Sequence, residues 1–162
     1  MHSPLSSGSP LLIILSLLCS KLQGVEKYSD AQGQCRGMAQ VIHGEGALDE
    51  EGEIIRARRI DSQAKHGVLA RAGAEFYVRL PRPGYVEWIW DVAAGNVVIE
   101  EAGGAMTDVE GKPIDFSLGA QLSAGVTGVL ASNGGVFHSA LIGAYRKQKE
   151  SRLAGSSSNL IK

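Results

Sequence analysis

The sequence WIWDVAAGNVVIEEAGG occupies residues 88–104 and decides most of the fold. Its apolar side chains recur at helical spacing, which predicts a helix over 92–102 with one apolar face. These side chains are Ala94, Val97, Val98 and Ala102. Gly103 and Gly104 end the helix, because glycine tolerates the left-handed conformation that follows a helix. Asp91 precedes it as an N-cap or first-turn residue, and we expect the helix to pack on a sheet.

Short strands and helices alternate on both sides of this helix. Upstream, the pattern predicts a strand near 54–60, a helix over 63–70 capped by Asp61 or Ser62, and a strand over 75–80. Downstream, it predicts strands at 105–107, 114–116 and 128–132 and a last helix from Val136 to about Lys149. Strands that alternate with helices indicate an α/β layered fold.

Composition limits the functions that fit. A chain of 162 residues, 44% hydrophobic and 20% charged, predicts one globular domain. Its net charge of −1 argues against nucleic acid or an anionic membrane as a partner, although a small phosphorylated ligand needs only a local positive site. Cys19 and Cys35 form no CxxC pair, so neither a zinc site nor a disulfide framework is indicated. We expect reduced thiols and a cytoplasmic location.

Several charged residues have more than one interpretation. Asp91 is either a helix cap or a metal ligand beside amide groups that face a phosphate. Arg79 lies on a strand predicted to be half-buried, where a cation needs a partner such as phosphate. Ser62 and Lys65 lie just before and inside the preceding helix, where a single lysine is usually solvated surface. The acids at 49–53 are interpreted as a solvated loop.

These stretches resemble a known family. DSQAKHGVLARAGAEFYVRLP and the residues from Tyr85 through WIWDVAAGNVVIEEAGGAMTDVEGKPIDF are similar to the carboxy-terminal half of 3'(2'),5'-bisphosphate nucleotidases. Those enzymes are magnesium-dependent, lithium-sensitive phosphatases of the inositol monophosphatase superfamily. The WDxAAG and EAGG motifs are shared across the superfamily, whereas DSQAK and YxRLP are typical of the nucleotidase branch. The resemblance covers residues 59 to about 145 and implies the carboxy-terminal α/β domain of the layered inositol monophosphatase sandwich.

The resemblance also implies roles for matching residues. Asp91 falls on an aspartate that binds Mg²⁺ and touches the substrate phosphate, and Ser62, Lys65 and Arg79 fall on residues that hold the nucleotide. The implied reaction hydrolyses the 3'-phosphate of adenosine 3',5'-bisphosphate (PAP) to give AMP, with the sulfated nucleotide PAPS as a further substrate. A water molecule activated by magnesium is the implied nucleophile. No residue of this chain is assigned as a catalytic acid or base.

The sequence departs from this family at its metal motif. The DPxDGT motif that supplies most metal ligands is absent, since the chain contains neither Asp-Pro nor Asp-Gly-Thr. A single carboxylate competes poorly with the water shell of Mg²⁺, so we expect impaired catalysis. Two alternatives stay open: a non-catalytic remnant that binds a nucleotide or a partner, and a phosphatase acting on inositol phosphates. DSQAK and YVRLP argue against the second alternative.

The amino-terminal segment fits none of these patterns. The apolar run LLIILSLLC at 11–19 is shorter than the roughly 20 residues that span a bilayer, so no stable membrane span is expected. Three interpretations of the run stay open. It belongs to a secretory signal within residues 1–20 that lacks the usual positive flank, it is a strand or helix of the fold, or it is sequence foreign to the fold. We expect residues 1–53 to be a non-family or poorly ordered segment from a truncated gene product. Residues 54–150 then form the domain, and 151–162 a flexible tail.

Overall fold

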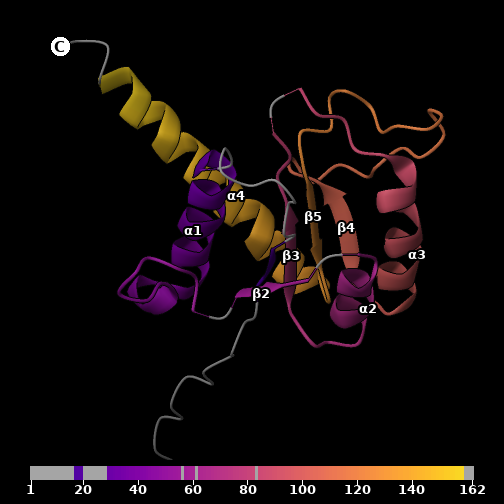
Figure 1. Ribbon diagram of the computed structural model, residues 1–162, viewed down its shortest axis with the longest axis horizontal. Coiled ribbons are helices and arrows are strands. Elements are labelled where there is room, and N and C mark those ends of the chain that lie inside the picture. Colours follow the sequence, from indigo (N-terminus) through magenta and orange to yellow (C-terminus); the bar gives the residue numbers. More distant parts are fainter. Residues whose placement is uncertain (1–16, 20–28, 56, 61, 83, 159–162) are drawn as a thin grey trace, which may run out of the picture.

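The computed structural model describes residues 17–19, 29–55, 57–60, 62–82 and 84–158. These form a sheet with helices on both faces (Figure 1), which confirms the predicted α/β class. Helices α1 (Ser29–His43) and α4 (Gly135–Ser158) pack together on one face. Helices α2 (Ala64–Ala70) and α3 (Ala93–Glu101) pack together on the other. None of the helices in this part of the chain combines the length and apolar composition needed to cross a bilayer.

The sheet has five strands in the order β2-β1-β3-β5-β4. Their bounds are β1 Leu17–Cys19, β2 Ala57–Arg59, β3 Phe76–Arg79, β4 Ala105–Asp108 and β5 Val129–Ser132. Strand β1 pairs in parallel with β2 and β3, whereas β5 pairs antiparallel with β3 and β4. The central position of β3 places the residues of the YVRL stretch in the middle of the sheet.

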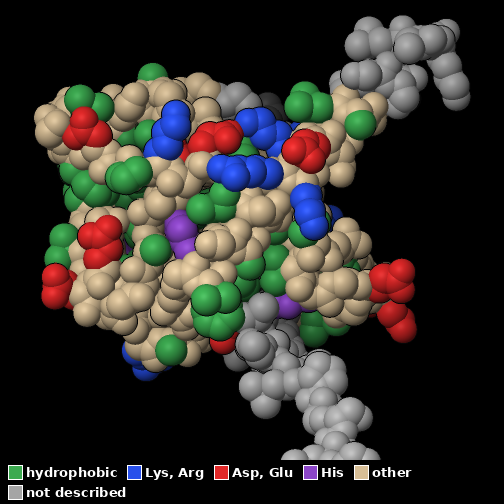
Figure 2. Space-filling model, turned by 180° about the vertical axis from the view of Figure 1, so that it is seen from behind, with side chains coloured by type: hydrophobic (Ala, Val, Ile, Leu, Met, Phe, Trp, Pro, Cys, Tyr) green, Lys and Arg blue, Asp and Glu red, His purple; other side chains and the backbone are tan. Residues whose placement is uncertain are grey.

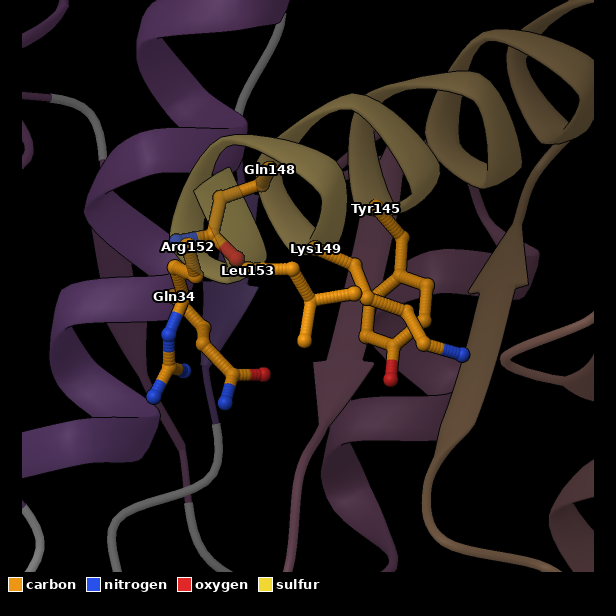
Figure 3. Close-up of a pocket in the computed structure, with 6 residues that line it drawn as sticks. All are labelled: Gln34, Tyr145, Gln148, Lys149, Arg152 and Leu153. Carbon is orange, nitrogen blue, oxygen red and sulfur yellow. The ribbon is translucent and has the colours of Figure 1, made fainter. Parts of the chain in front are cut away.

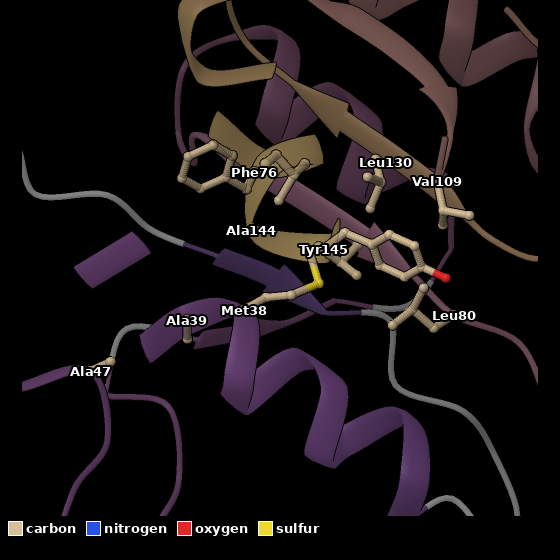
Figure 4. Packing of buried hydrophobic residues seen from close by; sticks show 11 residues of the cluster. Met38, Ala39, Ala47, Phe76, Leu80, Val109, Leu130, Ala144 and Tyr145 are labelled. Carbon is tan, nitrogen blue, oxygen red and sulfur yellow. The ribbon is translucent and has the colours of Figure 1, made fainter. Parts of the chain in front are cut away.

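Alternation along β3 divides its side chains between two cores. Phe76 and Val78 point to the side of α1 and α4, where they pack in a cluster with Met38, Leu130 and Tyr145 (Figure 4). Tyr77 belongs to the second cluster, on the side of α2 and α3. Since residues two apart on a strand share a face, Arg79 points to the same side as Tyr77. The predicted strand 75–80 therefore presents Arg79 to the face that carries α2 and α3.

Two short 3-10 turns complete the described chain, η1 (Glu45–Ala47) and η2 (Ile89–Asp91). Asp91 ends η2, and helix α3 begins two residues later with Val92, which makes no side-chain cap bond, as its N-cap. The predicted capping role of Asp91 is therefore wrong. Helix α2 likewise has Gln63 as its N-cap rather than Ser62, and Asp61 lies outside the described residues.

Some predicted elements differ in extent from the observed ones. Residues 114–116 form no strand, although Ile114 and Phe116 still pack against the α2–α3 cluster. Helix α4 continues to Ser158, so the part of the expected tail at 151–158 is helical. No stop residue ends α4 near Lys149, so the helix continues. The polar composition of its last turns hid this extension from the sequence analysis. The rest of the tail, 159–162, lies outside the described residues.

The largest difference concerns the segment expected to lie outside the fold. For residues 29–53 this expectation is wrong: helix α1 packs on α4, and Met38 and Ala39 are fully buried. Low apolar content and Gly33 and Gly37 concealed this helix from the periodicity. Leu17–Cys19 forms β1, so the strand interpretation is the one borne out for this part of the apolar run. The remainder of that run lies outside the described residues.

Candidate functional site

Gln63 joins the DSQAK segment to the start of α3. Its side-chain Nε2 donates to the carbonyl oxygens of Asp91, at 3.2 Å, and Trp90, at 3.4 Å. This contact joins the segment that carries Ser62 and Lys65 to η2, although Gln63 and Asp91 are 28 residues apart in sequence. The Asp91 carboxylate itself makes no hydrogen bond or ion pair within the described part of the chain. The residue is half-buried.

Ser62 and Lys65 contact each other at the start of α2. The Lys65 Nζ donates to the Ser62 carbonyl oxygen at 2.9 Å, and the Ala64 amide donates to Ser62 Oγ at 3.3 Å. Ser62 has a φ of 67°, a left-handed conformation that costs a residue other than glycine about 1–3 kcal/mol. Lys65 is buried, with Nζ 5.8 Å from the centroid of the Tyr77 ring. The general expectation that a single lysine is solvated surface therefore does not hold for Lys65.

Arg79 is paired with a buried carboxylate. Its Nε donates to Glu87 Oε1 at 2.6 Å, and its Nη2 to Oε2 at 3.2 Å. Burial lowers the pKa of the Arg79 guanidinium, but the hydrogen bonds and charge of Glu87 outweigh burial and raise that pKa above its ordinary value. The partner that the buried cation requires is thus present within the protein, and a phosphate would share Arg79 with Glu87.

His66 fixes the orientation of Gln63. Its Nδ1 lies 2.8 Å from Gln63 Oε1. Because the Gln63 amide nitrogen donates to the η2 carbonyls, Oε1 is an acceptor and His66 Nδ1 is the donor. His66 packs edge-on against Tyr77 with the ring planes at 87°, and it fits because the facing residue on α3 is Gly95. A Cβ atom at Gly95 would overlap the imidazole ring. The chain His66–Gln63–Asp91 therefore sets the position of η2.

The burial of His66 predicts an acid-sensitive fold. Burial and, second, the charge of Lys65 lower the pKa of His66 to about 4, from about 6.5 in an unfolded chain. The unfolded chain then binds more protons between these values, so stability present above pH 6.5 is lost as the pH falls toward 4. The loss is at most roughly 3 kcal/mol, at about 1.4 kcal/mol per pKa unit.

Urea unfolding of the wild type and His66→Asn across this pH range measures the effect. Asparagine keeps a donor for Gln63 and does not titrate, so the variant should lose less stability on acidification than the wild type. His138, whose pKa burial also lowers, titrates in both proteins and cancels in the comparison. Equal pH dependence of the two proteins would contradict this role of His66.

The described residues do not by themselves fit a magnesium site. They contain no group of three or more His, Cys, Asp or Glu side chains placed to hold a metal ion. The acids expected to be a solvated loop are tied locally: the Glu53 amide donates to Asp49 Oδ1 at 2.7 Å, and Arg36 pairs with Glu53. Mg²⁺ needs several oxygen ligands in near-octahedral geometry, and Asp91 supplies one carboxylate. On their own, the described residues therefore do not form a magnesium-dependent catalytic centre.

Neither the charged surface nor the cavity found elsewhere is as suitable for a phosphorylated ligand as the region around Asp91. Figure 2 shows Lys and Arg side chains interspersed with Asp and Glu along one side of the face it presents, not a patch of one sign. A cavity of about 270 Å³ lies between α1 and α4 (Figure 3), the two helices on the face of the sheet opposite α2 and α3. It is lined by Gln34, Tyr145, Gln148, Lys149, Arg152 and Leu153. Lys149 there pairs with Glu110 at 2.7 Å, which reduces its availability to an anion.

The predicted residues thus lie on one side of the sheet, around α2, β3 and η2. The sequence analysis missed Gln63, His66 and Glu87, which hold this arrangement. Gln63 and His66 lie inside the quoted DSQAKHG stretch, but only the fold reveals that they reach η2. For Glu87 a signal was available, because a half-buried Arg79 requires an acid and Glu87 lies nearby in sequence.

Comparison with known proteins identifies related chains. A sequence model of the inositol monophosphatase family matches residues 14–150. The chain is 47% identical over 98 residues to a 3'(2'),5'-bisphosphate nucleotidase of Oryza sativa and 36% identical over 121 residues to one of Schizosaccharomyces pombe. These matches cover 60% and 72% of this chain but 27% and 34% of the relatives. The chain therefore spans about a third or less of their length.

Solved structures share the fold. An inositol monophosphatase from Anabaena has a TM-score of 0.54 and 21% identity, over 82% of this chain and 45% of the other. A Thermotoga maritima IMPase has a TM-score of 0.50 and 19% identity, over 85% of this chain and 42% of the other. The match of the architecture extends beyond residues 59–145, the range covered by the motifs.

Proposed function

The chain belongs to the inositol monophosphatase family, and from this premise we propose that its α/β unit is the nucleotide-holding part of a 3'(2'),5'-bisphosphate nucleotidase. The family is one of metal-dependent phosphatases, and the curated relatives named above are nucleotidases. The proposed ligands are adenosine 3',5'-bisphosphate, its product AMP and PAPS, with Mg²⁺ as the metal. We also propose a cytoplasmic location.

The Gln63 contact to η2 carries the proposal. It joins the segment of Ser62 and Lys65 to the backbone of Asp91 just before α3, which supports a site made by these residues. Cationic side chains attract phosphate oxygens, and the amide groups at the start of α3 add a favourable dipole. A carboxylate beside a phosphate is repulsive unless a cation lies between them. Asp91 is therefore useful to such a ligand only when a metal ion accompanies the phosphate.

The chain's own residues bind and orient the nucleotide in this proposal. Lys65 and Arg79 neutralise phosphate charge, Ser62 offers a hydroxyl, and Gln63 keeps Asp91 in place. Hydrolysis would need a magnesium ion to activate a water molecule, and the described residues do not by themselves hold one. Since the described residues give that ion one carboxylate, we propose that the chain binds the nucleotide and hydrolyses it poorly.

Calorimetric titration of AMP into the wild type and Asp91→Asn tests this role of Asp91. Without divalent metal, removal of the negative charge should leave AMP affinity unchanged or raise it up to about fivefold, the effect of roughly 1 kcal/mol of charge repulsion. With excess Mg²⁺, the wild type should bind more tightly than the variant. Glu150→Gln, which removes an exposed charge from α4, should behave as the wild type in both buffers.

Phosphate release from adenosine 3',5'-bisphosphate separates binding from turnover. We expect release in magnesium to stay at the level of a protein-free blank. If phosphate is released and Asp91→Asn abolishes this release, the chain is an active nucleotidase and the proposed impairment is rejected. An AMP affinity that neither Mg²⁺ nor the Asp91 substitution changes would reject the proposed site.

A further inference from the structure

Helix α3 is apolar on two sides, but the described fold covers only one of them. Val92 and Ile99 are buried in the α2–α3 cluster, and Gly95 is buried against the His66 ring. The apolar side chains that the sequence assigns to the packed face are instead exposed: Ala94, Val97, Val98 and Ala102. The prediction of which face packs on the sheet is therefore wrong. A surface helix usually turns polar side chains outward, so an apolar outer face indicates a docking surface.

The exposed residues lie together on the outer side of α3. Four of them recur at intervals of three or four along η2 and α3, which places them on one side: Trp90, Ala94, Val97 and Glu101. Trp90 is 59% exposed, Val97 58% and Val98, beside Val97, 48%. Figure 1 shows α3 at the edge of the molecule, with no other described helix or strand on its outer side. We call the four apolar residues the α3 stripe: Trp90, Ala94, Val97 and Val98.

The area of the α3 stripe fits a weak contact between two copies of the chain. Trp90 offers roughly 100–150 Å² at this exposure, because an aromatic side chain buries about 150–250 Å² in all. The two half-exposed valines add roughly 100 Å². Since interfaces are about 60% apolar, a stripe of this size belongs to an interface of roughly 400 Å² on each copy. That is about half of what a stable complex buries per partner, so the dimer should be reversible.

The charges of α3 favour an antiparallel orientation of the two helices. Glu100 and Glu101 lie in the last turn, where the helix dipole is unfavourable to acids. Within the described part of the chain, neither carboxylate makes a hydrogen bond or ion pair. The first turn contains no acid, and its N-cap residue Val92 makes no side-chain cap bond. Antiparallel helices bring each acidic end to the partner's first turn. Asp91 precedes that turn and offsets part of the attraction, so these charges select the orientation more than they add affinity.

We propose that two copies of this chain associate through the α3 stripe, with their α3 helices antiparallel about a two-fold axis that passes between Val97 and Val98. Such a pairing uses the same surface on both copies. Val97 then faces the partner's Val98, and Glu101 faces the partner's Ala94. The small side chain of Ala94 allows the helix axes to approach to about 8–10 Å. The inference goes beyond the proposed function, because no ligand takes part in the contact.

Analytical ultracentrifugation of the full chain over a range of concentrations tests the association. We expect a dimer with a dissociation constant on the order of 100 μM, weaker than the micromolar limit for interfaces of full size. Val97→Glu brings two like charges together near the axis and should weaken the dimer at least about tenfold. The matched control is Val136→Glu on α4, at a valine that is 85% exposed, and it should associate as the wild type does. Glutamate has a higher helix propensity than valine, so Val97→Glu should keep its fold, which circular dichroism checks.

Disulfide cross-linking tests the orientation without disturbing the centre of the contact. Ala94→Cys and Glu101→Cys are oxidised separately and as a mixture, with the wild type showing the background from Cys19 and Cys35. The mixture should give a cross-linked dimer well above this background, because positions 94 and 101 face each other across antiparallel helices. Each variant alone should stay at the background, since like positions lie several residues apart along the paired helices.

Each outcome either supports this interface or rejects it. A wild type that stays monomeric at several times the expected dissociation constant would overturn the proposal. Loss of the dimer in Val136→Glu but not in Val97→Glu would place the contact on α4 and reject the α3 stripe. Cross-links that are as abundant in the single variants as in the mixture would reject the antiparallel geometry. A monomeric wild type that still binds AMP would leave the proposed function standing without this interface.

Discussion

Replacement of Gly95 by alanine is expected to lower the free energy of unfolding by about 1–3 kcal/mol, the usual cost of forcing an extra methyl group into a packed site. Gly95 lies inside α3, where alanine would otherwise stabilise the helix by up to about 1 kcal/mol. The added Cβ would overlap the His66 ring, which is 2% exposed and packed against Tyr77. Because the ring is buried, making room for the methyl group requires a shift of the ring or of α2 relative to α3.

The same change should also weaken nucleotide binding. Displacement of His66 removes its hydrogen bond to Gln63 Oε1, which orients the Gln63 amide. The Gln63 contact to the Asp91 carbonyl is then lost as well. Gly67→Ala on α2 is the matched control, because a Cβ there meets nothing within 4 Å. That variant should be neutral or more stable. Urea unfolding at neutral pH measures both variants, and a Gly95→Ala protein as stable as Gly67→Ala would contradict the close packing.

Loss of the buried acid Glu87 is expected to have the largest effect on stability. Glu87 is 2% exposed and Arg79 16%, measured on their side chains, so Glu87→Leu leaves the guanidinium charge largely buried without its carboxylate. Breaking a buried ion pair at one end costs about 3–5 kcal/mol, a large part of the 5–15 kcal/mol that stabilises an ordinary domain. The loss should appear as a lower urea midpoint of unfolding, with an unchanged dependence of the unfolding free energy on urea concentration.

A second substitution distinguishes an unpaired charge from lost packing. Arg79→Met combined with Glu87→Leu removes both charges, and its stability should recover most of the loss seen in Glu87→Leu. Glu110→Gln is the control at an exposed pair, with Lys149, and should change stability by less than about 1 kcal/mol. A double variant no more stable than Glu87→Leu would show that the pair is not the cause.

The double variant also tests the proposed role of Arg79 in binding. If it is folded and stable but binds AMP much more weakly than the wild type, Arg79 contributes to the ligand site as well as to the core. Unchanged AMP affinity in a stable Arg79→Met/Glu87→Leu protein would restrict Arg79 to a structural role. The two measurements are independent, since one follows unfolding in urea and the other follows the heat of AMP binding.

The sequence predicts the elements around residues 88–104 because their apolar residues recur with a clear period. Helices α2 and α3 and strands β3, β4 and β5 are close to their predicted positions. Helix α1 was missed because its glycines and polar residues leave a short apolar stripe, which only contact with α4 makes stable. The strand expected at 114–116 is absent because its apolar residues pack as a loop against the α2–α3 cluster.

The site was predictable in part. Family motifs point to Ser62, Lys65, Arg79 and Asp91, and their roles in binding stay predictions. The contacts that arrange them come from residues whose importance depends on three-dimensional neighbours: Gln63 reaches η2, and His66 enters the space left by Gly95. No local pattern predicts such a long-range hydrogen bond. The sequence likewise contains both tryptophans but does not predict that the rings of Trp88 and Trp90 stack.

Backbone amide shifts in the NMR spectrum of the full chain, titrated with adenosine 3',5'-bisphosphate and Mg²⁺, test the central claim most directly. The claim is that the segments 62–66, 76–79 and 88–93 form one ligand site on the α2–α3 side of the sheet. We predict that the largest shifts fall together in these segments. Shifts confined to α1 and α4 around the cavity that contains Tyr145, or no shifts at saturating nucleotide, would contradict it.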